Sequence, residues 1–292
     1  MSLAFRVSRG GRDALRRMAL AAFGRWLQRE SARHRADACP PVAVYAFDLV
    51  GHQINLRGRY ERDELDVVMQ LIARIDTRPR ALCLDVGANI GNHALYFASH
   101  YEQVVAFEPQ PRTFRLLQLN AELVSNVQCR HLGLSDAAGQ AFIDLPAGNA
   151  GMARVSQGGT GWRCELQTLD AAVAADPRRV SLIKIDVEGH EAQVLRGARQ
   201  RLERDQPVVL LEQAAHDFTD GSSPAIDVLR SAGYASFVTL EPTPATGSRW
   251  LDLLSRLLSG DGYRAVWRDR LPARFHSMIV AVPPVLAASA PA

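Results

Sequence analysis

From residue 81 onward, short apolar runs alternate with segments of helical periodicity. Apolar runs without polar alternation are typical of strands that are buried on both faces of a parallel sheet. Helical segments between such strands indicate crossover connections, which join parallel neighbours. Strands are predicted at 81–86, 103–107, 127–134, 180–187, 207–211, 235–240 and 278–282, and helices at 92–100, 112–124, 191–202 and 225–232. The expected fold class is therefore α/β, with a doubly wound, mostly parallel sheet and helices on both faces.

The composition fits a globular chain that can bury a core. Of the 292 residues, 47% are hydrophobic and 22% are charged, which excludes the disordered and collagen-like classes. The sequence has no uncharged apolar stretch of about 18 residues, the length that a membrane-spanning helix requires. The longest apolar run near the start, at 18–23, is too short for the core of an export signal. We therefore expect a cytoplasmic protein.

The first 40 residues differ in charge from the rest. They contain nine arginines and three acidic residues, a net charge of +6 in a chain whose total is +3. Apolar residues recur there at helical spacing, so residues 1–40 are predicted to form a basic amphipathic helical extension. Such a helix could pack on the main domain, or contact a partner or the inner face of a membrane. The nearly balanced total charge gives no reason to expect nucleic-acid binding.

Residues 41–80 separate this extension from the α/β region. Two strand-like runs, at 42–50 and 52–58, flank Gly51 and predict a hairpin, which a helix at 60–75 follows. The predicted organisation is an extension, then a hairpin and helix packing on the core, then the main domain, at 1–40, 41–80 and 81–292.

The strongest local signal is the turn DVGANIG at 85–91, between the first predicted strand and its helix. Its two glycines allow a sharp backbone turn, and the helix start offers free N–H groups. Glu108 follows the second strand, where a carboxylate can accept two hydrogen bonds from a ribose diol. Ligands of open parallel sheets bind at the carboxyl ends of the strands. Both segments therefore predict a nucleoside-containing ligand at this edge.

The spacing of the glycines distinguishes a dinucleotide site from a site for S-adenosylmethionine. A dinucleotide site needs G-x-G-x-x-G, so that the backbone can contact a pyrophosphate. Here the pattern is G-x-x-x-G, and Asp85, which precedes it, would repel a pyrophosphate. A carboxylate there suits a ligand with a positive amino group and no phosphate, such as S-adenosylmethionine. The alternatives are an NAD-dependent oxidoreductase, and a structural role for Asp85 in capping the turn.

Six segments, in this order and spacing, together resemble the FkbM family of S-adenosylmethionine-dependent methyltransferases. They are DVGANIG at 85–91, FEP at 107–109, Asn120, LSD at 134–136, TLD at 168–170 and IKIDVEGHEAQVLRGA at 183–198. GRYERDEL at 58–65 is also similar to the family's N-terminal motif. The resemblance extends from about residue 58 to residue 213. Residues 1–40 and those after 241 match no motif of the family.

The resemblance implies a class I methyltransferase fold, which is Rossmann-like and has a seven-stranded, mostly parallel sheet. Six strands would be parallel, and an antiparallel seventh would lie at 277–282. The implied contacts of S-adenosylmethionine are Asp85, Gly87, Asn89 and Gly91 for the methionine part, Glu108 for the ribose, and Ser135 and Asp136 for the adenine. The family mostly methylates hydroxyl oxygens. The implied acceptor is therefore a hydroxyl of a saccharide, glycolipid or natural product.

Charged residues at alternate positions mark one side of the predicted strand at 180–187. Lys184, Asp186 and Glu188 share that side, and charges on a buried strand need partners or a ligand. Methyl transfer to an alcohol requires a group that takes the hydroxyl proton. We expect Asp186 to be the central polar group, with Glu188 and His190 as alternatives for the base. The structural alternative is an ion pair between Asp186 and Lys184, with Glu188 capping the next helix.

Asp186, Glu188 and Glu212 could also converge at neighbouring strand ends and bind Mg²⁺ through oxygen. The sequence does not establish the convergence, so no metal ligand is assigned. His93, after the glycine turn, and His216, after Glu212, are secondary candidates for contacts with the cofactor and the acceptor.

The sequence leaves other functional classes open besides the methyltransferase. They are the oxidoreductase, a non-catalytic binding protein of the same fold, and a nucleic-acid methyltransferase. The acceptor is not readable, because acceptor pockets are built from variable loops. Two segments are expected to form those loops: 146–161, with five glycines, and the apolar insertion 243–271.

Overall fold

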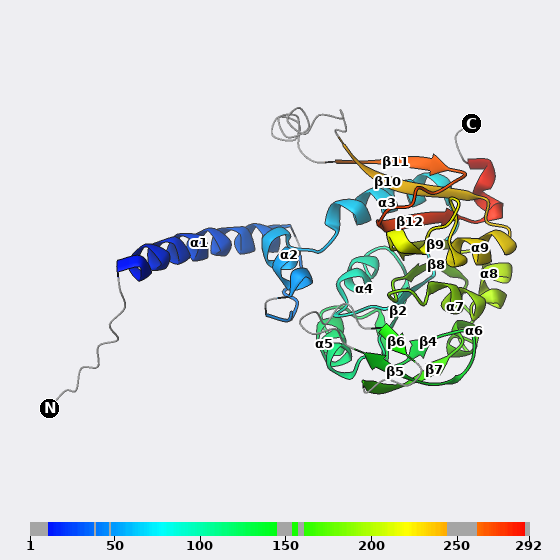
Figure 1. Cartoon of the computed structure of the whole chain (residues 1–292), viewed down its shortest axis with the longest axis horizontal. Coiled ribbons are helices and arrows are strands. Elements are labelled where there is room, and N and C mark those ends of the chain that lie inside the picture. Colours follow the sequence, from blue (N-terminus) through cyan, green and yellow to red (C-terminus); the bar gives the residue numbers. More distant parts are fainter. Residues whose placement is uncertain are drawn as a thin grey trace. The chain divides into compact units, whose positions relative to one another are not determined.

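The structure is a computed structural model of the chain and describes residues 11–37, 39–46, 48–144, 154–156, 161–243 and 262–289. It divides into two compact units, Met1–Tyr60 and Glu61–Ala292, and Figure 1 shows the elements of each. Most of the 146–161 loop and the apolar part of the 243–271 insertion lie outside the described residues, as do residues 1–10.

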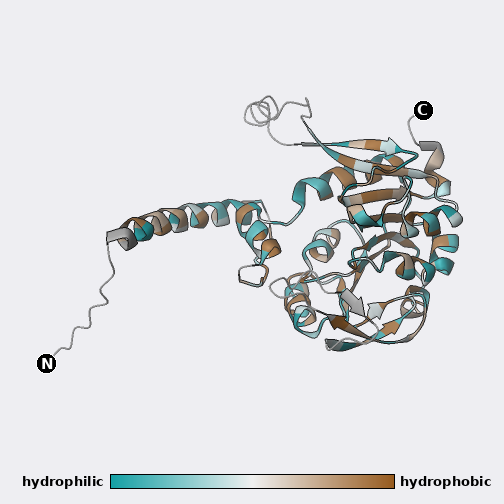
Figure 2. Cartoon of the chain, in the orientation of Figure 1, coloured by the Kyte–Doolittle hydropathy of each residue, from teal (hydrophilic) through white to brown (hydrophobic). Residues whose placement is uncertain are grey.

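The first unit contains the predicted N-terminal helix, α1 at Gly11–Ala36. Its apolar and basic side chains are not segregated onto opposite faces, and Figure 2 shows both kinds alternating along the helix. The amphipathic part of the prediction is therefore wrong, because arginines recur around the whole helix. Leu15 and Met18 are 72% and 69% exposed. Among the helices that the structure describes, none is long and apolar enough to span a membrane.

The hairpin predicted at 42–58 is wrong, because a helix, α2 at Leu49–Arg57, occupies its second half. The Asp48 side chain caps the start of α2 and accepts hydrogen bonds from the N–H groups of Val50 and Gly51, at 3.1 and 3.4 Å. Gly58, with φ +79°, ends the helix, and its N–H donates to the carbonyl of Ile54. A capping residue at the start and a left-handed glycine at the end are strong helix signals. Here they override the short strand-like alternation.

Eight strands form the main sheet of the second unit, in the order β11-β10-β12-β9-β8-β1-β2-β3. Their bounds are β1 Leu82–Val86, β2 Gln103–Phe107, β3 Val127–Arg130, β8 Val180–Ile185, β9 Val208–Gln213, β10 Ser236–Thr243, β11 Gly262–Arg268 and β12 His276–Val282. The strands β3, β2, β1, β8 and β9 pair in parallel, and β12 is antiparallel to both β9 and β10. Six strands therefore run in one direction with β12 reversed among them, as expected for a class I methyltransferase (Figure 1).

The main sheet has eight strands and not the predicted seven, because β11 extends it antiparallel to β10. This strand lies in the segment for which the sequence predicts a helix-like insertion. Tyr263 and Trp267, on one side of β11, pack against the core, while Arg268 pairs with Glu241 on β10. The alternation of side chains over these seven residues has the period of a strand.

A second sheet of four strands has the order β4-β7-β5-β6. Its strands are β4 Gly133–Leu134, β5 Gly139–Asp144, β6 Arg154–Ser156 and β7 Trp162–Gln167. The single strand predicted at 127–134 is therefore wrong in extent, because β3 ends at Arg130 and β4 belongs to this second sheet. Between them the N–H of Leu132 donates to the carbonyl of Arg130, a three-residue turn that redirects the chain.

Helices cover both faces of the main sheet, as predicted. The helices of this unit are α3 Arg62–Ile75, α4 Asn92–Phe97, α5 Pro111–Ala121, α6 Leu169–Ala172, α7 Glu191–Arg196, α8 Arg199–Asp205 and α9 Pro224–Ser231, with two 3-10 helices, η1 Ala215–Asp217 and η2 Pro284–Ser289. One core cluster contains Leu65 of α3 and Leu117 of α5, and the other contains Leu195 of α7 and Leu229 of α9. The two clusters lie on opposite faces, and they hold the strand ends in a fixed register.

Candidate active site

A cavity opens at the carboxyl ends of β1, β2 and β8. We call it the first cavity. Its lining includes Gly87, Glu108, Asp186, Glu188 and His190, all of them predicted site residues. The strand ends thus bring together five of the ten predicted residues around one cavity.

The glycine turn is shaped by contacts between chain segments. Gly87 has φ +75°, and a Cβ atom there would lie 1.8 Å from the carbonyl oxygen of Asp186. Only glycine allows β1 and the chain after β8 to approach so closely. Gly91, with φ +93°, opens α4, and Asn89 adopts φ +51°, which asparagine tolerates better than most residues. The contact of these three residues with a cofactor stays a prediction.

Glu108 joins the ends of β1 and β2. Its Oε2 accepts a hydrogen bond from the N–H of Asn89 at 3.0 Å, and its Oε1 accepts one from the N–H of Gln110 at 2.8 Å. Burial raises the pKa of Glu108 to about 7, although these two hydrogen bonds act in the opposite direction. A carboxylate has about four acceptor positions, so Glu108 keeps two for the hydroxyls of a ligand in the first cavity.

Asp85 lies beneath the turn and is fully buried, at 0% exposed. Its Oδ1 is 3.4 Å from Lys184 Nζ, and Lys184 is also 3.3 Å from Asp186 Oδ2. Burial lowers the pKa of Lys184, but the carboxylates of Asp186 and Asp85 outweigh it and raise that pKa above its ordinary value. The predicted ion pair between Asp186 and Lys184 is therefore present. Asp85 does not line the first cavity, and its contact with a cofactor stays a prediction.

The two predicted adenine contacts differ in position. Ser135 is buried, and its Oγ lies 2.9 Å from Nε2 of His190, which lines the first cavity. Asp136 is exposed and lies 3.8 Å from Arg196. Burial lowers the pKa of His190 and so favours its neutral form. The carbonyl of Ser135 packs against Gly197, where the helix predicted at 191–202 breaks into α7 and α8.

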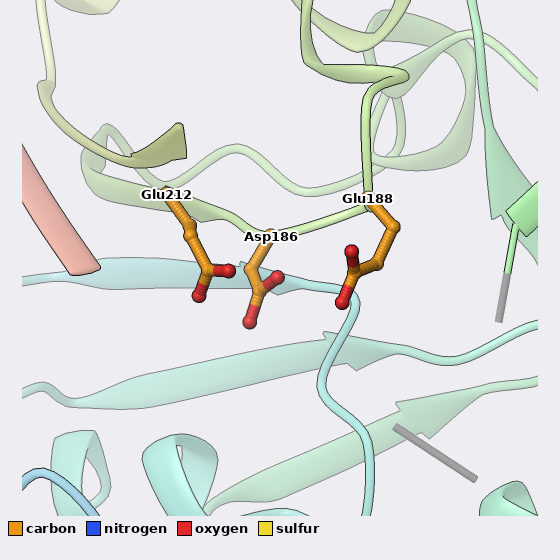
Figure 3. A group of neighbouring side chains, drawn as sticks. All are labelled: Asp186, Glu188 and Glu212. Carbon is orange, nitrogen blue, oxygen red and sulfur yellow. The ribbon is translucent and has the colours of Figure 1, made fainter. Parts of the chain in front are cut away.

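Three carboxylates converge at the ends of β8 and β9, as Figure 3 shows. Oxygen atoms of Asp186, Glu188 and Glu212 all lie within 4.8 Å of one another. Burial, Asp186 and Glu61 together raise the pKa of Glu212 to about 9. Carboxylate oxygens are the ligands that Mg²⁺ prefers, so this cluster could hold a divalent cation. The convergence suggested by the sequence is thus confirmed.

A second, smaller cavity shares Asp186 with the first. Its polar lining includes Glu61, His93, Lys184, Asp186 and Glu212, and Asp186 lines both cavities. Nε2 of His93 lies 3.2 Å from Oε2 of Glu61, and both side chains are about nine-tenths buried. Sequence reasoning missed Glu61, although it belongs to the GRYERDEL motif. His216, in contrast, is exposed and lines neither cavity.

The strand order, the reversed β12 and the cavity at the strand ends define a class I methyltransferase. The family described as "Methyltransferase FkbM domain" matches residues 85–236, which is more than half of the chain. The chain therefore belongs to the FkbM family of S-adenosylmethionine-dependent methyltransferases.

The chain is similar to two named methyltransferases and to one solved structure. A hexuronic acid methyltransferase, AglP, of Haloferax volcanii is 29% identical over 199 residues, which cover 67% of this chain and 82% of that protein. Methyltransferase 1 of Beauveria bassiana is 34% identical over 141 residues, 39% of this chain and 57% of that protein. A solved structure of an FkbM methyltransferase from Methylobacillus flagellatus KT is similar over 47% of this chain and 34% of that chain, with 17% identity and a TM-score of 0.34.

Proposed function

We propose that this methyltransferase transfers a methyl group from S-adenosylmethionine to a hydroxyl oxygen of a saccharide, glycolipid or natural product. One observation carries the proposal: two adjoining cavities share the carboxylate of Asp186. A donor in the first cavity and an acceptor in the second would meet at a group that can take a proton. The relative named as a hexuronic acid methyltransferase supports a sugar-like acceptor.

The residues of the first cavity fit the proposed donor. Glu108 has acceptor positions left for a ribose diol, and Glu108, Asp186 and Glu188 make the lining acidic. Asp85 is a buried carboxylate whose oxygens receive no hydrogen bond from the described residues. The nearby cation, Lys184, is shared between Asp85 and Asp186. An acidic site of this kind favours a cation and disfavours a pyrophosphate. S-adenosylmethionine would supply an electrophilic methyl group on a positively charged sulfur.

Asp186 is the proposed general base. It lines both cavities, whereas Glu188 and His190 line only the first, so Asp186 alone of the three lies where donor and acceptor would meet. Lys184 holds the Asp186 carboxylate at 3.3 Å and orients it. As the acceptor oxygen bonds to the methyl carbon, its proton would pass to Asp186. A positioned base of this type typically contributes about 10²–10⁴-fold to the rate.

A divalent cation would change this assignment. If Mg²⁺ binds, Asp186, Glu188 and Glu212 would hold it, and it would lower the pKa of an acceptor hydroxyl. Turnover in EDTA, compared with turnover in added Mg²⁺, separates the two forms of the proposal. Full activity in EDTA would support the carboxylate as base, and a strict need for the cation would support the metal-assisted form.

The proposal is tested by binding and then by product analysis. Calorimetric titration should show binding of S-adenosylhomocysteine and none of NAD. Labelled donor is then incubated with sugars and other polyols, and the products are analysed by NMR and by alkaline hydrolysis. A methyl ether survives alkali and is the expected product. Products that are only methyl esters or methylamines would contradict transfer to a hydroxyl.

A further inference from the structure

The second cavity is lined by five elements of the fold. Glu61 comes from the residue before α3, His93 from α4, Asp186 from the chain after β8, Glu212 from β9, and Ser277 from β12. The apolar part of its lining comes from Leu210 and Leu211 of β9 and from Met278 of β12. A few polar groups in a partly apolar lining are typical of a pocket that orients a ligand.

The charges that face this cavity are mostly negative. Glu61 and Asp186 contribute carboxylates, and Asp85 lies behind them. Lys184 could offset part of this charge, but it is already shared between two carboxylates, at 3.4 and 3.3 Å. An acceptor carboxylate placed here would gain no free cation among the described lining residues. It would also lie beside like charges in a partly dehydrated site, which is unfavourable.

His93 is the other described lining residue that can carry positive charge, and it already lies beside Glu61. Its Nε2 faces Glu61 Oε2 at 3.2 Å, and the two side chains are 9% and 10% exposed. Glu61 has φ +55°, a backbone conformation that is costly for a residue other than glycine. A carboxylate has about four acceptor positions, and hydroxyl groups can donate to them.

We propose that hydroxyl groups of a neutral polyol reach into the second cavity, with the reacting hydroxyl beside Asp186 and a neighbouring hydroxyl on the Glu61–His93 pair, and that this site rejects an acceptor with a carboxylate at that position. The inference rests on the proposed transfer to a hydroxyl and narrows its substrate class. It separates this chain from the relative that is named for a hexuronic acid. Specificity of this kind arises from repulsion of the wrong acceptor as well as from attraction of the right one.

The test compares matched pairs of acceptors. Labelled donor is supplied with p-nitrophenyl glucoside, galactoside and mannoside, each beside the uronoside of the same configuration, with EDTA and with Mg²⁺. The expected kcat/KM is at least about tenfold higher for the neutral member of an accepted pair. Equal or better methylation of the uronosides would overturn the inference and leave transfer to a hydroxyl intact. Transfer to neither class, with S-adenosylhomocysteine still bound, would overturn the saccharide acceptor of the proposed function and the inference with it.

A variant of Glu61 tests whether this residue causes the preference for neutral over acidic acceptors. Glu61→Gln keeps the size of the side chain and removes its charge, so it should narrow the preference for neutral acceptors by about tenfold. Asp63→Asn is the matched control, because it removes one charge from the first turn of α3 at an exposed position outside the cavity. The control should keep the wild-type preference, and both variants should bind S-adenosylhomocysteine normally. A change as large in Asp63→Asn as in Glu61→Gln would show a general charge effect and would contradict the assignment to Glu61.

Discussion

At the scale of single residues, Glu108 combines two tasks. Its carboxylate ties the turn after β1 to the end of β2, and it faces the first cavity with acceptor positions to spare. Because burial raises its pKa to about 7, its charge changes near neutral pH. A ribose diol donates to the charged form, so the affinity for the donor should fall as the pH drops through 7.

Replacing Glu108 with alanine should weaken binding of S-adenosylhomocysteine by about ten- to a hundredfold, since hydrogen bonds to a charged group contribute about 1.5–3 kcal/mol. Glu108→Gln should bind with nearly the same affinity at pH 6 and pH 8, whereas the wild type should bind more tightly at pH 8. Calorimetry at both pH values measures this. Unchanged affinity in both variants would remove Glu108 from the donor site.

Replacing Asp186 with asparagine should lower kcat by about 10²–10⁴-fold, because the amide cannot take the acceptor proton. The affinity for S-adenosylhomocysteine should change by no more than about threefold. Glu188→Gln is the comparison variant, since Glu188 lines only the first cavity. A single-turnover assay with labelled donor measures the chemical step. Normal turnover in Asp186→Asn would exclude it as the base.

At the scale of elements, a buried network fixes the chain after β8 to the end of β9. Oε1 of Glu191 accepts hydrogen bonds from the N–H groups of Val187 and Gly189, at 3.3 and 3.0 Å. Oε2 of Glu191 accepts one from Gln213 at 3.4 Å, and Gln213 accepts one from Ser223, which caps α9. The network thereby holds the two segments that present Asp186 and Glu212.

Glu191→Ala should therefore lower kcat by at least about tenfold, because the carboxylates lose their relative positions. Glu191→Gln should recover much of the activity, since its amide oxygen can still accept from the loop. Asp170→Ala is the matched control: Asp170 also accepts two backbone N–H bonds, at 2.9 and 3.0 Å, but lines neither cavity. Melting temperatures and kcat are measured for all three. A loss of kcat in Asp170→Ala equal to that in Glu191→Ala would indicate a general effect of lost stability.

The sequence predicted the strand ends of the first cavity because buried apolar runs show where a strand stops. Glu108 and Asp186 follow such runs directly, so their convergence was predictable from parallel topology. The second cavity was not predictable in this way, since the pairing of Glu61 with His93 depends on how α3 packs beside α4. The prediction of a hairpin was wrong for a local reason. Asp48 and Gly58 cap a helix, and these capping signals outweigh the short strand-like alternation.

At the scale of the whole molecule, the positive charge is concentrated at one end of the sequence. The first 40 residues carry +6, so the remaining 252 residues carry −3. Because the apolar residues of α1 do not form one face, we expect contact with an anionic membrane surface to be electrostatic, without deep insertion. Vesicles with anionic lipid should bind the protein at low salt and release it at high salt, with little change in tryptophan emission. Binding to neutral vesicles would contradict this.

The buried carboxylates also set how the stability of the fold depends on pH. Burial and the neighbouring Asp186 raise the pKa of Glu212 from 4.5 to about 9, so near neutral pH the folded protein keeps a proton that the unfolded chain has lost. The free energy of unfolding should therefore fall as the pH rises toward 9, by up to about 1.4 kcal/mol per pH unit from this group. The pKa values of His190 and His276 are lowered. These two histidines therefore change the stability mainly below about pH 6.5, outside the range in which Glu212 acts.

Glu212→Gln isolates this contribution, because it keeps the side chain and removes the proton equilibrium. Urea unfolding of the metal-free, donor-free protein at pH 7 and pH 8.5 should show a steep loss of stability in the wild type and a shallower loss in the variant. The variant should also be the more stable of the two at pH 8.5, since its folding does not require uptake of a proton that the unfolded chain has lost. Parallel pH profiles in the two proteins would mean that Glu212 is already ionised at neutral pH, which would contradict its raised pKa.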